Sequence, residues 1–109
     1  MFKKRRGIKM PYNEQGLIYF TCMNIKCLSE EEQQIILNLC REVAGEYAEA
    51  LYTMLTDDTK NVHAVARLYF TSESLLYLYR RRFYERYKAY LIQKGVLTER
   101  HRWSPFTER

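Results

Sequence analysis

The sequence predicts a single all-α domain of about four helices, and three observations lead to that prediction. Apolar residues recur at helical spacing through most of residues 29–94. Two serines, Ser29 and Ser72, stand where they would cap the N-terminal ends of helices. Only residues 17–25 are rich in β-formers, and no second convincing strand is present to pair with them. A chain of 109 residues has the length of one domain around one core.

Residues 1–28 are interpreted as a basic arm ahead of this domain. The arm begins with a cluster of four basic side chains, Lys3, Lys4, Arg5 and Arg6. We expect the apolar residues 17–25 to lie over the core as an extended or helical segment. The arm would then be partly anchored and partly available to a partner.

The first clear helix begins at Ser29, which has Glu32 three residues further on, as in a capping box. An apolar stripe follows but is interrupted at Gly45. We therefore expect two helices, at about 29–43 and 45–56, with Gly45 as a kink or break between them.

A polar connector at residues 56–61 leads to a second helical pattern at about 61–69. An unbroken helix from there to residue 94 would have about 34 residues and a length of some 50 Å. That is long for a chain with only one other apolar hairpin to cover it. Ser72 is suited to cap a new helix, so we predict a turn before it and a final helix at about 72–94, ending at Gly95.

These assignments divide the chain into three parts. They are a basic arm or extended segment at 1–28, a helical domain at 29–95 and a C-terminal tail at 96–109.

The final helix is expected to have an inward and an outward face. At about 100° per residue, the inward stripe is Leu76, Tyr79, Phe83, Tyr87, Tyr90 and Lys94. The opposite face is Ser74, Tyr77, Leu78, Arg81, Glu85 and Lys88. Tyr77 and Tyr84 lie off the inward stripe, so they are the better candidates for stacking on a base.

The charges of the chain are unevenly distributed. Residues 1–28 have six basic and one acidic side chain, residues 29–58 have one basic and eight acidic, and residues 80–109 have nine basic and three acidic. Two basic ends around an acidic middle favour a polyanion as the partner of the ends.

The sequence has no catalytic or metal-binding motif. A Gly-rich phosphate loop and an HExxH pattern are absent. Cys22, Cys27 and Cys40 have no His or Cys partner at zinc-site spacing, and they are interpreted as small buried hydrophobes. No apolar run has the roughly 18 residues of a membrane span, and no apolar h-region follows the basic start. We therefore expect a cytoplasmic protein that is not an enzyme and needs no cofactor or metal.

The stretch VARLYFTSESLLYLYRR resembles the helix-turn-helix of small bacterial regulators over about residues 61–87. Sporulation-type regulators and the fourth region of sigma factors have such a motif. Ala66 takes the close-packed position of the first helix, Tyr69 is the aromatic residue before the turn, and Ser72 opens the second helix. Phe70 stands where a turn glycine or asparagine is frequent.

This resemblance implies that the final helix enters a DNA groove. The residues expected to contact bases are Ser72, Glu73, Ser74, Tyr77, Leu78 and Arg81. Those expected to contact phosphates are Lys60, Arg67, Arg80, Arg82 and Arg86, together with Lys3, Lys4, Arg5 and Arg6 of the arm.

The resulting hypothesis is a sequence-specific DNA-binding transcriptional regulator of a bacterium, phage or mobile element. Its partner would be double-stranded DNA, and a module this short often binds as a homodimer. The alternative is a non-catalytic protein-interaction module, for instance a phage-encoded inhibitor of a host protein, because Arg, Tyr and Trp also suit protein interfaces. A third hypothesis is RNA or ribosome binding through the two basic ends.

Overall fold

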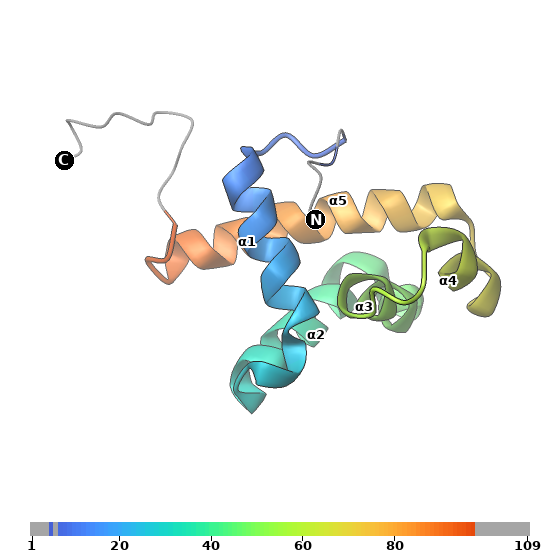
Figure 1. Cartoon of the computed structure of the whole chain (residues 1–109), viewed down its shortest axis with the longest axis horizontal. Coiled ribbons are helices and arrows are strands. Elements are labelled where there is room, and N and C mark those ends of the chain that lie inside the picture. Colours follow the sequence, from blue (N-terminus) through green and yellow to red (C-terminus); the bar gives the residue numbers. More distant parts are fainter. Residues whose placement is uncertain (1–4, 6, 98–109) are drawn as a thin grey trace.

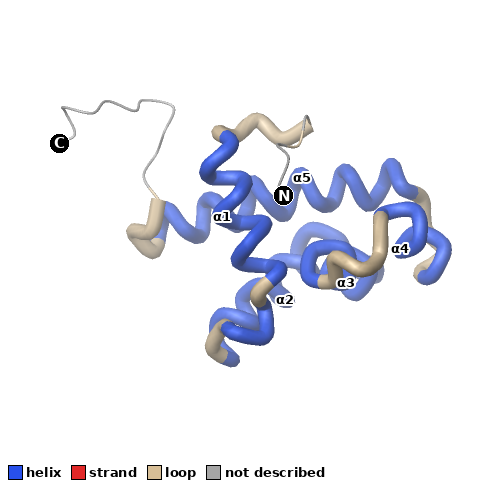
Figure 2. Tube along the Cα trace, viewed as in Figure 1, coloured by secondary structure: helices blue, strands red, loops and turns tan. Residues whose placement is uncertain are grey.

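Helices account for all the regular secondary structure in the part of the chain that the computed structural model describes, residue 5 and residues 7–97 (Figure 1 and Figure 2). The α-helices are α1 (Tyr12–Met23), α2 (Glu30–Ala44), α3 (Ala48–Thr56), α4 (Val62–Leu68) and α5 (Glu73–Gln93), and the short 3-10 helices are η1 (Ile25–Cys27) and η2 (Gly45–Tyr47). The all-α fold class is confirmed, with α1 as an additional helix. Within the described residues, none of the helices is both long enough and apolar enough to cross a bilayer.

The α2–α3 hairpin follows the predicted boundaries closely. Ser29 Oγ accepts a hydrogen bond of 3.1 Å from the backbone N–H of Glu32, which caps α2 as predicted. Gly45 has a φ of +55°, a left-handed conformation that glycine adopts without a steric penalty. The predicted break between two helices at Gly45 is therefore confirmed.

Of the two conformations expected for the apolar residues 17–25, extended or helical, the structure shows the helical one, and the helix begins earlier, within the predicted arm. Residues 12–23 form α1, which crosses α5 and contacts both α3 and α5 (Figure 1). Ile18 and Cys22 are buried on its inner side, whereas Phe20 on its outer side is exposed. Because apolar side chains lie on both sides of α1, the sequence of this segment does not show the apolar spacing of an amphipathic helix. Because the described residues include no strand to pair with it, a helix is the conformation that satisfies the backbone N–H and C=O groups of this segment.

Every other α-helix contacts α5, which runs the length of the molecule (Figure 1). The smaller apolar cluster joins α3, α4 and the first half of α5 through Ala50, Met54, Val65, Ala66 and Leu76. The larger cluster joins α1, α2, α3 and the second half of α5, and its fully buried side chains include Ile18, Ile36, Leu51 and Phe83. Each such side chain contributes about 1.5–3 kcal/mol when it is removed from water. α5 is thus the element on which the fold is assembled.

The predicted inward stripe of α5 is confirmed except at its end, where Lys94 is exposed. Tyr84 and Leu91 are buried as well, because α1 and the N-terminal residues cover a second side of α5. Only 1% of Tyr84 is exposed. The prediction that Tyr84 can stack on a base is therefore wrong.

α5 ends as the sequence predicts. Its last residue is Gln93, and Gly95 follows with a φ of +84°. Residues 98–109 of the predicted tail lie outside the described residues.

The three cysteines differ in their surroundings. Cys22 and Cys40 are buried, as predicted, whereas Cys27 is exposed and is not a buried hydrophobe. Burial raises the pKa of the Cys22 thiol, and it raises that of Cys40 to about 12. Neither buried thiol ionises near neutral pH, so both act as packing groups.

An ion pair connects α1 to the second half of α5. Lys88 Nζ lies 2.8 Å from Glu14 Oε1, and the two side chains are 22% and 4% exposed. Lys88 was predicted on the outward face of α5, but α1 covers this part of that face. Because a buried charge without a partner costs several kcal/mol, the pair fixes where α1 sits on α5.

We expect Lys88→Met to lower the free energy of unfolding by about 3 kcal/mol, because the ion pair between Lys88 and the buried carboxylate of Glu14 would be lost. A second variant that also carries Glu14→Gln should recover most of this loss, since the carboxylate that pairs with Lys88 is then removed as well. Urea denaturation followed by circular dichroism at neutral pH measures both values. Equal losses in the single and double variants would contradict the role of the ion pair.

Candidate nucleic-acid interface

The chain turns sharply between α4 and α5, and residues 69–72 separate the two helices. The N–H of Thr71 donates to the carbonyl of Ala66 at 2.9 Å, and the N–H of Phe70 donates to the carbonyl of Arg67 at 3.4 Å. These two hydrogen bonds form a Schellman motif, which ends a helix by placing one residue in the left-handed conformation. That residue is Phe70, with a φ of +56°. The predicted interruption of the helix is confirmed.

Phe70 adopts this conformation although it has a side chain and is 91% exposed. A residue other than glycine loses about 1–2 kcal/mol in such a conformation. The neighbours of Phe70 hold the turn in place. The hydroxyls of Tyr69 and Thr53 lie 3.1 Å apart and connect the turn to α3, while Ser72 Oγ accepts a hydrogen bond of 3.1 Å from the N–H of Leu75 and caps α5.

α4 supports the start of α5, and we refer to residues 61–81 as the α4–α5 unit. Asn61 Oδ1 caps α4 by accepting from the N–H of Ala64 at 2.8 Å. Across the helix pair, His63 Nδ1 lies 2.8 Å from Glu73 Oε2. Beneath them, the smaller apolar cluster packs the two helices together. The first turns of α5 are therefore rigidly placed.

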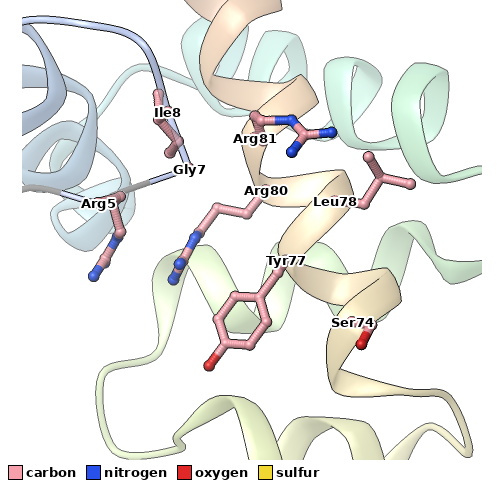
Figure 3. A pocket seen from close by; sticks show the side chains of 8 residues that line it. All are labelled: Arg5, Gly7, Ile8, Ser74, Tyr77, Leu78, Arg80 and Arg81. Atoms are coloured by element: carbon pink, nitrogen blue, oxygen red, sulfur yellow. The ribbon is translucent and has the colours of Figure 1, made fainter.

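The six residues predicted to contact bases lie together on the first turns of α5. All are exposed except Leu78, which is half-buried. Four of them, Ser74, Tyr77, Leu78 and Arg81, line an open cavity of about 450 Å³ between α5 and the N-terminal residues (Figure 3). The first two of the six already have partners within the α4–α5 unit, and Leu78 is half-buried and has no polar group, so Ser74, Tyr77 and Arg81 are the better candidates.

The predicted phosphate contacts divide into exposed and engaged side chains. Arg67 and Arg82 are exposed. Lys60 is exposed as well, but its Nζ lies 3.2 Å from Asp57 Oδ2. The remaining predicted contacts of the arm, Lys3, Lys4 and Arg6, lie outside the described residues.

The prediction that Arg86 contacts a phosphate is corrected, because Arg86 instead joins α5 to α2. Its Nη2 donates to Glu42 Oε1 at 3.1 Å, and its Nε donates to Glu42 Oε2. The hydrogen bond from Arg86 lowers the pKa of Glu42, and the same bond raises the pKa of Arg86. A guanidinium held by both oxygens of a carboxylate is neutralised, so it adds little attraction for a polyanion.

A fully buried glutamine anchors the N-terminal residues on α1. Gln15 Oε1 accepts from the N–H of Arg5 at 2.8 Å, while its Nε2 donates to the carbonyls of Ile8 at 3.0 Å and Met10 at 3.1 Å. Sequence reasoning missed Gln15, because its partners are loop backbone groups that no side-chain pattern reveals. The consequence is that Arg5 is fixed against the helices.

Arg80 faces Arg5 and is partly buried. Its guanidinium carbon lies 5.0 Å from the ring centroid of Tyr77, and that of Arg5 lies 5.5 Å from the ring centroid of Tyr19. Burial, followed by the charge of Arg5, lowers the pKa of Arg80 to about 10. Figure 3 shows both guanidinium groups directed to the same side of α5. The sequence predicted both residues as phosphate contacts but not that they would meet.

Comparison of the chain with family models, curated proteins and solved structures gives no match. The geometry of the α4–α5 unit and of the arginines around it is therefore the basis for a functional proposal.

We expect Phe70→Gly to raise the free energy of unfolding by about 1 kcal/mol, because glycine relieves the left-handed strain and little packing is lost. Leu68→Gly is the matched control. It lies in the last turn of α4 and should lower the same quantity by about 1 kcal/mol. Chemical denaturation of both variants measures these changes, and a loss of stability in Phe70→Gly would contradict the conformation of the turn.

Proposed function

We propose that this protein binds duplex DNA through the first turns of α5, as a small transcriptional regulator does. The single observation that carries the proposal is the turn at Phe70. It separates α5 from α4 and leaves the exposed residues Ser74, Tyr77 and Arg81 on the start of a rigidly supported helix.

The dimensions and chemistry of this helix suit the major groove, which admits one α-helix. Ser74, Tyr77 and Arg81 are three and four residues apart, so they lie one above another on the same side of α5. Arg81 can pair with guanine through two hydrogen bonds, an interaction worth about 1–3 kcal/mol of discrimination. Ser74 and Tyr77 can add contacts to a base edge or to the sugar-phosphate backbone.

The distribution of charge favours the same orientation. Arg67 is exposed on the α4–α5 unit, Arg82 is exposed directly after it, and both can contact phosphates. The exposed acidic residues Glu46 and Glu49 lie in η2 and in the first turn of α3, where they would repel a polyanion. This charge disfavours η2 and the start of α3 as a DNA-facing surface.

A protein-interaction module is the second candidate, and the exposed apolar tip of the turn favours it. Phe70 is 91% and Leu68 is 54% exposed. An exposed aromatic residue in a strained conformation is a feature of binding sites, and aromatic side chains are enriched at protein interfaces. This candidate predicts a protein partner that contacts Phe70 and requires no nucleic acid.

We expect the full chain to bind a random-sequence duplex with an affinity that falls steeply with salt. Neutralising three phosphates would weaken binding about 40-fold between about 50 and 200 mM salt. Fluorescence anisotropy at several salt concentrations measures the slope. Absence of binding at the lowest salt would overturn the proposal, and a pull-down compared between the wild type and Phe70→Ala would then test the second candidate.

We expect Arg81→Ala to erode sequence preference and Arg82→Ala to weaken all sequences alike. Arg81 is placed to contact a base, whereas its exposed neighbour Arg82 is placed to contact a phosphate. Selection from a random duplex library, followed by affinity measurements on selected and random duplexes, gives the ratio of affinities for each variant. An unchanged ratio in Arg81→Ala would show that α5 does not read bases through this residue.

A further inference from the structure

We propose that Arg5 and Arg80 form a preorganised seat for one phosphoryl group, in a groove between the N-terminal residues and α5. The inference deepens the proposed function and rests on it for the source of the group, a phosphate of the DNA backbone. The predicted phosphate contacts are single side chains on the surface. The seat is instead a pair of arginines from two distant parts of the chain.

The first support is the shape of the surface around the two arginines. Arg5, Tyr77 and Arg80 line the open cavity of about 450 Å³ and also a second open cavity of about 350 Å³. The two cavities are therefore neighbouring parts of one groove, with the arginine pair where they meet. A groove of this size is wide enough for a sugar-phosphate unit to lie against the pair.

The second support is that both side chains are held in place before a ligand binds. Gln15 fixes the backbone of Arg5, and the ring of Tyr19 lies under its guanidinium. The ring of Tyr77 lies under Arg80 in the same way. A guanidinium stacked on an aromatic ring is held in one orientation. Little side-chain freedom remains to be lost on binding.

The third support is the electrostatics of the pair. Two positive guanidinium groups repel each other, and Arg80 is partly withdrawn from water, with its Nε atom buried and without a hydrogen-bond partner among the described residues. A phosphoryl group carries several acceptor oxygens, so it can accept from both arginines and remove their mutual repulsion.

The acidic residues at the far end of the groove give the bound chain a direction. Asp57 and Asp58 line the second cavity. Asp57 accepts hydrogen bonds from Thr59 and Lys60. The hydrogen bonds from Thr59 are the main cause that lowers the pKa of Asp57 to about 2, so Asp57 is a carboxylate at neutral pH. Lys60 pairs with Asp57 in the same cavity, so Asp58 is the acidic residue there that repels a phosphate. The backbone is therefore directed from the arginine pair toward Arg81 in the first cavity.

The experiment is a titration of the full chain with inorganic phosphate, followed through the Nε–H signal of Arg80 in nuclear magnetic resonance spectra. We expect a saturable shift in the millimolar range that chloride at equal ionic strength does not produce. Arg5→Ala should weaken phosphate binding at least about fivefold, since one of the two charge-assisted contacts is lost. Arg41→Ala, which removes an exposed arginine of α2 that lines neither cavity, should leave it unchanged.

A second arm measures the affinity for random-sequence duplex. Arg80→Ala should weaken it for every sequence and reduce the salt slope by about 1. Phosphate binding without duplex binding would support the seat and overturn the proposed function. Duplex binding that Arg5→Ala and Arg80→Ala leave unchanged, with no shift of the Arg80 signal in phosphate, would overturn the seat and leave the proposed function standing.

Discussion

The left-handed turn at Phe70 is the constraint on which the rest of the structure depends. It ends α4 through the hydrogen bond from Thr71 to Ala66 and allows Ser72 to cap a new helix. Without it, one helix of about 34 residues would have no surface on which to fold back. Because of it, α5 packs its first half on α3 and α4 and its second half on α1 and α2. The exposed start of α5 and the groove beside it are consequences of the same turn.

Local signals in the sequence predicted the elements that local chemistry determines. Ser29 and Ser72 cap helices as expected, and Gly95 ends the last one, because each of these effects involves neighbours within a few residues. Phe70 is instructive, since it stands in the position where glycine or asparagine is frequent and still adopts the conformation that the turn requires. The tertiary contacts on both sides of it outweigh its own preference.

The sequence could not predict features that depend on contacts between distant segments. α1 has apolar residues on both sides, so the spacing of these residues did not reveal a helix. Because α1 packs over α5, Tyr84 is buried and Lys88 is half-buried, although the sequence predicted both outside the inward stripe of α5. The same reason applies to Arg86, which is 44 positions from Glu42 in sequence but bound to it in the fold. Of the candidate site, the six residues predicted to contact bases lie together at the start of α5, as the sequence predicts. Arg5 lies near Arg80 because Gln15 binds the backbone of Arg5, and the sequence does not reveal that contact.

We propose that nucleic acid contacts the start of α5 and the arginines around it, and mapping of amide signals on adding a duplex tests this most directly. The account predicts that Ser74, Tyr77 and Arg81 shift with the added duplex while Glu46 and Glu49 on the acidic side do not. Shifts confined to the α2–α3 face, or spread evenly over the molecule, would contradict it.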